Sequence, residues 1–243
     1  MIIVDRLKGK VAIITGGTSG IGQGIAECFV REGAKVVITG RHVPTTPNDN
    51  VTFMQQDISL EEDWLRVIKE TVEKFGQLDI VVNNAGIAPK YESIDKLSLA
   101  DWQKVIDVDL TGTFLGIKHA MAEMVKEKHA GSIINIASIA SFIGGAKSSS
   151  YGAAKGGVRL LTKCAAIDGT AYQPTIRVNS VHLGAIRTNI LTSDQVKAFG
   201  EQTPIGHIGE PSDIGELCVY LGSDESKFVT GSNFIIDGGW TAI

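Results

Sequence analysis

Residues 10–22 of the 243-residue chain have the sequence KVAIITGGTSGIG, and this stretch decides the fold class. Its first six residues are apolar and rich in β-branched side chains, which is typical of a buried strand. The glycines after it lead into a helical pattern with Ile25 and Phe29 on one face, and a second apolar strand follows at residues 34–39. A strand, a glycine-rich turn, a helix and a strand within about 30 residues form the unit that binds dinucleotides.

The glycine-rich turn at residues 16–22 predicts a phosphate site. Glycines let the backbone approach a pyrophosphate closely, and the amino terminus of the helix meets its negative charge. The alternative is a glycine-rich loop without a ligand. The strand before the turn and the helix and strand after it favour the dinucleotide site.

The end of the second strand indicates which dinucleotide binds. Folds that prefer NAD usually carry Asp or Glu at this position, where the carboxylate binds the ribose 2′-hydroxyl. This chain has Gly40 there, followed by Arg41 and His42. A guanidinium without a carboxylate suits a 2′-phosphate, so we expect NADP(H). The alternative is that Arg41 is a solvated arginine at a strand end.

The rest of the chain continues the alternation of strands and helices. It predicts an α/β fold: a Rossmann-type, doubly wound, parallel seven-stranded sheet of order 3-2-1-4-5-6-7 with helices on both faces. Residues 1–243 form one domain, with a mobile lid at about residues 189–207. Gly40 to Asn50 contains Pro44 and Pro47, so the helix between strands two and three is expected to be shortened or absent. The further strands are expected at 51–55, 78–82, 132–138, 176–181 and 233–236. Helices are expected at 60–75, 100–128 and 213–221, and a further helix carries Tyr151 and Lys155 and continues through 156–171.

Composition excludes several classes of partner. The net charge of −4 comes without a basic block, which argues against nucleic acid and anionic membranes. There is no apolar run long enough to span a bilayer. Cys28, Cys164 and Cys218 lie in helical stretches without Cys-x-x-Cys spacing, so we expect buried, inert thiols and a cytoplasmic location. The five histidines lack the spacing of metal ligands, and no metal site is expected.

Tyr151 and Lys155 are the candidate proton-handling pair. Residues four apart lie on one face of a helix, so the phenol and the ammonium should point the same way. The ammonium favours the phenolate and is expected to lower the pKa of the phenol towards neutrality. Ser138, at the end of the predicted fifth strand, can bring a hydroxyl to the same place. Taken alone, a Tyr-x-x-x-Lys pair is a common coincidence of surface residues.

Together these motifs resemble the short-chain dehydrogenases/reductases. The glycine turn, the run 83–86 (NNAG), Ser138, Tyr151-x-x-x-Lys155 and the run 237–239 (DGG) occur in the order seen in that family, over about residues 8–242. The carboxyl-terminal run 206–228 is most similar to the NADP-dependent secondary alcohol dehydrogenases (carbonyl reductases) of lactobacilli. The resemblance implies a homotetramer that pairs through the Tyr151 helix, the long helix and the last strand.

The resemblance also implies a reaction and a set of site residues. The reaction is reversible hydride transfer between NADPH and a carbonyl carbon. Ser138 would bind the carbonyl oxygen, Tyr151 would deliver or remove the proton, and Lys155 would lower the Tyr151 pKa and hold the nicotinamide ribose. The cofactor would contact Gly16, Thr18, Ser19, Gly20, Ile21, Gly22, Arg41, Asp57, Ile58, Asn84, Ala85, Gly86, Tyr151, Lys155, Ile186 and Thr188.

Two positions depart from the family pattern. The fourth catalytic residue of the family is an asparagine that holds a proton-relaying water, and this chain has Asp109 in its place. An ionised Asp109 would oppose the effect of Lys155 on Tyr151, which predicts a working enzyme with a shifted pH profile. The alternative is a damaged relay with weak activity. The second departure is Leu183 in place of the proline that usually precedes Gly184, which is expected to loosen the start of the lid.

Three functions are compatible with these observations. The first is an NADPH-linked ketone reductase or secondary alcohol dehydrogenase. The second is a reductase of the same fold for another substrate class, such as a 3-oxoacyl thioester, a diketone or acetoin, or a sugar. The third is a non-catalytic dinucleotide-sensing protein, which only Asp109 favours. The presence of Ser138, Tyr151 and Lys155 together favours the first two.

Overall fold

The computed structural model of the protein describes residues 5–44, 50–189 and 191–242. Its centre is a seven-stranded parallel sheet of order β3-β2-β1-β4-β5-β6-β7, which confirms the predicted strand order. The order reverses between β1 and β4, so a crevice opens at the carboxyl ends of these two strands. The strands are β1 (Val11–Thr15), β2 (Lys35–Gly40), β3 (Val51–Gln55), β4 (Ile80–Asn83), β5 (Gly131–Ser138), β6 (Ile176–Leu183) and β7 (Asn233–Ile236).

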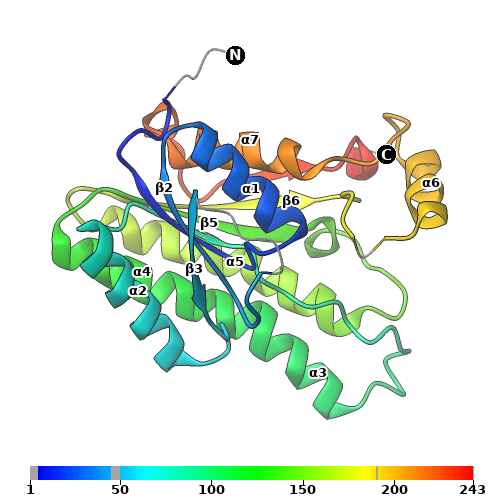
Figure 1. Ribbon diagram of the computed structural model, residues 1–243. Coiled ribbons are helices and arrows are strands. Elements are labelled where there is room, and N and C mark those ends of the chain that lie inside the picture. Colours follow the sequence, from blue (N-terminus) through cyan, green and yellow to red (C-terminus); the bar gives the residue numbers. More distant parts are fainter. Residues whose placement is uncertain (1–4, 45–49, 190, 243) are drawn as a thin grey trace.

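Helices cover both faces of the sheet. Figure 1 shows α1 and α7 on one face and α2, α4 and α5 on the other, while α6 lies beyond the carboxyl ends of the strands. Helices lie in the connections between successive parallel strands, as in other parallel sheets. The helices are α1 (Gly20–Arg31), α2 (Glu61–Phe75), α3 (Leu99–Val105), α4 (Gly112–Glu127), α5 (Ser149–Thr170), α6 (Ser193–Gln202) and α7 (Pro211–Gly222).

Two hydrophobic cores hold these layers together, one on each face of the sheet. On the α1 and α7 side, Phe29 and Ile214 are completely buried against β1, β4 and β5. On the other side, Trp64 of α2 and Met124 of α4 are completely buried in a second cluster. Burying a side chain of this size contributes about 1.5–3 kcal/mol, so the two cores fix where each strand ends and therefore where the crevice lies.

The helix expected over residues 100–128 is interrupted. Its first turns form α3 and its last four turns form α4, and between them Ile106–Thr111 form a π-helical segment, η1. A π segment holds one extra residue in a turn, and such segments occur often at functional sites. Apolar periodicity is similar on either side of the extra residue, so the pattern alone predicted one uninterrupted helix. The π segment contains Asp109.

Only part of the crossover between β2 and β3 lies within the described residues. Residues 41–44 are not helical, and residues 45–49 lie outside the described part of the chain, so the expected shortening of the helix is tested only at its edge. Val51, Thr52 and Phe53 of β3 are half-buried, whereas all five residues of β1 are buried. This edge of the sheet is therefore less covered than its centre.

The prediction of three buried thiols was wrong for Cys164. Cys28 and Cys218 are buried between α1 and α7, but Cys164 is exposed. Cys164 lies on the outer face of α5, where Leu160 and Ile167 are also exposed. An apolar pattern on a helix does not tell whether the chain itself or another molecule covers that face.

The predicted lid region has structure of its own. It contains α6, whose first turn is closed by a capping box between Thr192 and Gln195. Strand β6 extends two residues beyond its predicted end, and its last residue, Leu183, pairs with both Ser138 and Ile236. The mobility of the lid stays a prediction. Among the described residues, none of the helices is both long and apolar enough to cross a membrane.

Candidate active site

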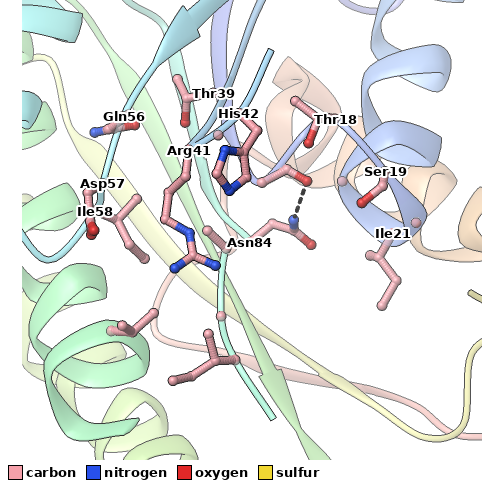
Figure 2. Close-up of a pocket in the computed structure, with 18 of the residues that line it drawn as sticks. Thr18, Ser19, Ile21, Thr39, Arg41, His42, Gln56, Asp57, Ile58 and Asn84 are labelled. Carbon is pink, nitrogen blue, oxygen red and sulfur yellow. Dashed lines mark hydrogen bonds between the residues drawn. The ribbon is translucent and has the colours of Figure 1, made fainter. Parts of the chain in front are cut away.

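A cleft runs across the carboxyl ends of β1, β2, β3 and β4. Figure 2 shows the side chains that line it, with Arg41 reaching into the space between the glycine turn and Asp57. Its position at the strand-order reversal is the one where ligands bind in open α/β sheets. The lining residues that the sequence predicted are Gly16, Thr18, Ser19, Gly20, Ile21, Gly22, Arg41, Asp57, Ile58, Asn84, Ala85, Gly86 and Thr188.

The glycine turn has a backbone that only glycine adopts easily. Gly16 and Gly20 have positive φ angles of 66° and 54°. A Cβ at Gly22 would overlap with the Gly16 carbonyl and the Asn84 amide. The turn is therefore close-packed on the side of Asn84. Its other side, at the amino terminus of α1, faces the cleft and is open to a ligand. Backbone amides and the helix dipole at that place suit an anion such as a pyrophosphate.

Asn84 holds the glycine turn from below. Its side-chain amide donates a hydrogen bond to the Thr15 carbonyl at 2.8 Å and lies 3.4 Å from the Gly16 carbonyl, the contact drawn in Figure 2. The Thr15 hydroxyl accepts hydrogen bonds from the backbone amides of Asn84 and Ala85, both at 3.0 Å. These bonds lock the ends of β1 and β4 together, so Asn84 shapes the cleft as well as lining it.

The other end of the cleft is polar. The Asp57 carboxylate accepts hydrogen bonds from the backbone amide of Ser59 at 3.0 Å and from its hydroxyl at 2.7 Å, which fixes this carboxylate. Nearby, the Thr39 hydroxyl and both amide atoms of Gln56 are buried without a partner within the described structure. Buried polar groups normally find partners, so this end of the cleft fits a ligand with hydrogen-bonding groups of its own.

Lys155 of α5 contacts β5 and the π segment η1. It is 5% exposed, and its ammonium donates to the Ile136 carbonyl of β5 at 3.3 Å. The same ammonium lies 5.5 Å from the centre of the Tyr151 ring, one turn earlier on α5. The predicted neighbourhood of phenol and ammonium is therefore present in the structure.

Asp109 lies against this pair. Its side chain is fully buried, and Oδ2 lies 3.4 Å from the Lys155 ammonium. Oδ1 accepts a hydrogen bond from the backbone amide of Ile87 at 2.8 Å. Oδ2 has no aligned hydrogen-bond donor within the described residues, so the contact with Lys155 is one of charge alone. A carboxylate this close offsets part of the positive charge that Tyr151 experiences.

Ser138 ends β5 beside the first turn of α5. It is the amino-terminal cap of the short 3₁₀ helix η2 (Ile139–Ser141), and its hydroxyl accepts a hydrogen bond from the Ala140 amide at 3.1 Å. The hydroxyl keeps its own hydrogen free to donate. Helix α5 packs on η2, and a Cβ at Gly152, next to Tyr151, would lie 3.7 Å from the Ala140 carbonyl. The end of β5 and the first turn of α5 are therefore neighbours in the fold.

Five predicted site residues are not among those that line the cleft: Asp109, Ser138, Tyr151, Lys155 and Ile186. Thr188 packs against Gly20 at its edge, whereas Ile186 is buried and lines a neighbouring cavity beside Gly209 and Gly238. Seven lining residues were not among the predicted site residues, although most are sequence neighbours of predicted ones at strand ends, a position that is itself a usable signal. They are Thr39, Gly40, His42, Gln56, Ile87, Val108 and Asn189. Among the described residues, no group of three or more His, Cys, Asp or Glu side chains has the arrangement that a metal ion needs.

Comparison with known proteins decides the family. Residues 16–241 match the family model described as Enoyl-(Acyl carrier protein) reductase. An NADP-dependent (R)-specific alcohol dehydrogenase of Lentilactobacillus kefiri is 45% identical, over 99% of this chain and 100% of its own. The chain belongs to the short-chain dehydrogenase/reductase family.

Other members of the short-chain dehydrogenase/reductase family match as fully. A trans-4-hydroxycyclohexanecarboxylate dehydrogenase of Sinomonas cyclohexanicum is 40% identical, with 99% of this chain and 96% of its own covered. The ligand-free structure of an aldohexose dehydrogenase of Thermoplasma acidophilum superimposes with a TM-score of 0.91 at 30% identity, over 98% and 96% of the two chains. The protein is therefore an oxidoreductase of a family that works with nicotinamide cofactors.

Proposed function

We propose that the protein is an NADP(H)-dependent alcohol dehydrogenase that interconverts a ketone and a secondary alcohol. One observation carries the proposal: the Tyr151 ring, the Lys155 ammonium and the Asp109 carboxylate lie together beside the cleft. The cleft is lined by Arg41, and Gly40 occupies the position where NAD-binding folds carry an acid. The similarity to the Lentilactobacillus kefiri enzyme, an NADP-dependent (R)-specific alcohol dehydrogenase, supports the same choice.

NADPH would supply the hydride for the carbonyl carbon, and the residues of the chain would handle charge and proton. Ser138 donates its free hydrogen to the carbonyl oxygen and stabilises the negative charge that develops there. Tyr151 gives its phenolic proton to that oxygen in reduction and takes it back in oxidation. Lys155 would favour the phenolate. Its ammonium has three N–H donors, and those that do not bond to the Ile136 carbonyl would hold the ribose next to the nicotinamide.

The cofactor would lie along the whole cleft. The backbone amides from Thr18 to Gly22 meet the pyrophosphate, and Arg41 meets the 2′-phosphate. Asp57 and Ile58 would contact the adenine. The Thr39 hydroxyl and the Gln56 amide, which have no hydrogen-bond partner among the described residues, also line this end of the cleft. Asn84, Ala85 and Gly86 line the path to the nicotinamide, which Thr188 closes at the far side. Ile186, which lines the neighbouring cavity, would support Thr188 from behind.

Replacing Tyr151 by Phe tests this mechanism. The variant removes one hydroxyl and the only dissociable proton of the ring, so we expect ketone-dependent oxidation of NADPH to fall at least a hundredfold. The fluorescence change on adding NADPH should persist, because the cleft is untouched. Full ketone reduction by the variant would exclude Tyr151 as the acid.

Relatives with other substrates keep a second proposal open. The matched proteins are named for a cyclohexane hydroxy acid, hydroxysteroids and an aldohexose, and the matching family model for an acyl-carrier-protein substrate. A panel of simple ketones, a diketone, a sugar and a 3-oxoacyl thioester, compared by kcat/KM with NADPH, separates these classes. Oxidation of NADPH by none of them would favour a dinucleotide-sensing role.

A further inference from the structure

A chain of hydrogen bonds connects His182 of β6 to the backbone of Ser138. The Ser138 carbonyl accepts a hydrogen bond from the Ser141 hydroxyl at 2.7 Å. The oxygen of that hydroxyl lies 2.7 Å from Nδ1 of His182. Nδ1 also lies 3.3 Å from the Ser138 carbonyl itself. The peptide that follows Ser138 is therefore held on one side by a serine and an imidazole.

The directions of these bonds follow from counting hydrogens. A serine hydroxyl carries one hydrogen, and Ser141 uses it on the Ser138 carbonyl. Ser141 therefore accepts its bond from His182, which places a hydrogen on Nδ1. The other ring nitrogen, Nε2, lies 2.8 Å from the Ser180 hydroxyl, which also lies 3.0 Å from Oδ1 of Asn233. In a neutral ring with its hydrogen on Nδ1, Nε2 is the acceptor, so the one hydrogen of Ser180 goes to Nε2. Nδ1 then donates towards Ser141 and the Ser138 carbonyl, and Nε2 accepts from Ser180.

The surroundings of His182 keep its ring neutral and fixed. The residue is 0% exposed, and the Phe142 ring packs on it with centroids 4.7 Å apart. Burial lowers the pKa of His182, and the positive charges of Arg159 and Lys163 on α5 lower it further. The Arg159 guanidinium covers the Phe142 ring at 4.6 Å and completes the packing. The imidazole has little freedom to turn.

The Ser138 hydroxyl accepts a hydrogen bond from the Ala140 amide at 3.1 Å, so holding the peptide that follows Ser138 also helps to hold this hydroxyl. We propose that His182, acting through Ser141, is a positioning residue that aims the Ser138 hydroxyl at the reacting carbonyl. This inference rests on the role given to Ser138 under the proposed function. A misplacement of a catalytic group by about 1 Å can lower a rate about a hundredfold. The hydrogen bonds that join His182 to Ser141 and Ser141 to Ser138 can therefore matter for catalysis without touching the substrate.

Two serine variants test the proposal as a matched pair. Ser141→Ala and Ser180→Ala each remove one hydroxyl that contacts His182, but only Ser141 also contacts Ser138. We expect Ser141→Ala to lower kcat for ketone reduction about 10- to 100-fold, with the Kd for NADPH unchanged. Ser180→Ala should lower kcat much less. Equal effects of the two variants on kcat would overturn the proposal.

Two histidine variants give a second, independent comparison. The amide nitrogen of an asparagine can take the place of Nδ1 as a donor, and the amide oxygen of a glutamine can take the place of Nε2 as an acceptor. His182→Asn therefore keeps the donor to Ser141 and should retain more activity than His182→Gln, which keeps only the Ser180 side. The opposite order, or no difference between the two, would contradict the proposal, even if the serine variants did not fold.

Ser138→Ala separates this inference from the proposed function. If Ser138→Ala keeps full ketone reductase activity, Ser138 does not bind the carbonyl and the proposed mechanism fails together with the inference. If Ser138→Ala abolishes activity while Ser141→Ala leaves kcat unchanged, the mechanism stands and only the positioning role of His182 falls.

Discussion

At the scale of single residues, Asp109 distinguishes this site from the family pattern. The family asparagine is neutral, whereas a buried carboxylate at 3.4 Å from the Lys155 ammonium offsets part of its charge. The sequence-based hypothesis of a shifted pH profile therefore concerns this one carboxylate, and its removal tests it.

Replacing Asp109 by Asn tests this effect. The change keeps an acceptor for the Ile87 amide and removes only the charge. We expect the rising limb of the pH profile of kcat for alcohol oxidation to move to lower pH, because a negative charge beside Lys155 is removed. Asp107→Asn is the matched control, because Asp107 lies in the same π segment and bonds only to exposed Gln103 among the described contacts. An unmoved profile in Asp109→Asn would show that the carboxylate does not act on Tyr151.

Arg41 carries the prediction of cofactor choice. Replacing Arg41 by Ala should weaken NADPH binding about 10- to 100-fold, since a charge-assisted hydrogen bond contributes about 1.5–3 kcal/mol. NADH lacks the 2′-phosphate and serves as the internal control, so its Kd should stay within about twofold. Titration of each cofactor by fluorescence measures both values. A parallel loss for NADPH and NADH would mean that Arg41 shapes the cleft without reading the phosphate.

Residue roles were predictable from sequence only where a motif fixes the backbone. The glycines at 16, 20 and 22 and Arg41 were predicted because strand ends and turns determine where these residues lie. The Asn84 contact with Thr15 and the bonds of His182 to Ser141 were not predicted. Such contacts join residues far apart in the sequence, and no periodicity reports them.

At the scale of elements, the close contact between α1 and α7 depends on small residues. A Cβ at Gly215 would lie 2.5 Å from the Cys28 sulfur and 3.0 Å from the Gly24 carbonyl. Overpacking of this kind costs about 1–3 kcal/mol, because the two helices must move apart. The contact matters for the site, since α1 begins at the glycine turn.

Gly215→Ala should therefore lower the free energy of unfolding by about 1–3 kcal/mol. Ser212→Ala provides the control on the same helix, because Ser212 is exposed and its change should stay within about 0.5 kcal/mol. Unfolding in urea at one protein concentration measures both variants. Equal midpoints for the two would show that α1 and α7 have room for a methyl group.

Elements were predictable to different degrees for a physical reason. Buried parallel strands such as β1 and β5 are continuous apolar runs, and their positions follow from the sequence. The π segment at Ile106–Thr111 was missed because one extra residue in a turn barely changes the apolar pattern. It nevertheless places Asp109 at Lys155, which is the contact that matters most for the chemistry.

At the scale of the whole molecule, assembly remains a prediction. Leu160 and Ile167 on α5 are 63% and 71% exposed, and Phe114 on α4 is 44% exposed. Exposed apolar side chains gathered on two neighbouring helices are typical of a protein–protein contact. These are the helices through which the resemblance implies pairing, so we expect a homotetramer in solution.

Light scattering during gel filtration tests the assembly. The native protein should have about four times the 25.9 kDa mass of one chain. Leu160→Asp places a charge in the centre of the α5 face and should yield smaller species. The matched control is Leu65→Asp on α2, where Leu65 is 56% exposed on a helix outside the expected contact. A monomeric native protein would exclude the tetramer.

The exposed thiol of Cys164 supplies its own assay for that contact. It lies on the α5 face between Leu160 and Ile167, while Cys28 and Cys218 are buried inside the chain. A thiol-reactive dye added to the native protein should therefore label this one position in a dissociated chain and react far more slowly in an assembled one. The labelling rate, followed as the protein is diluted, reports how tightly the subunits associate without any engineered probe.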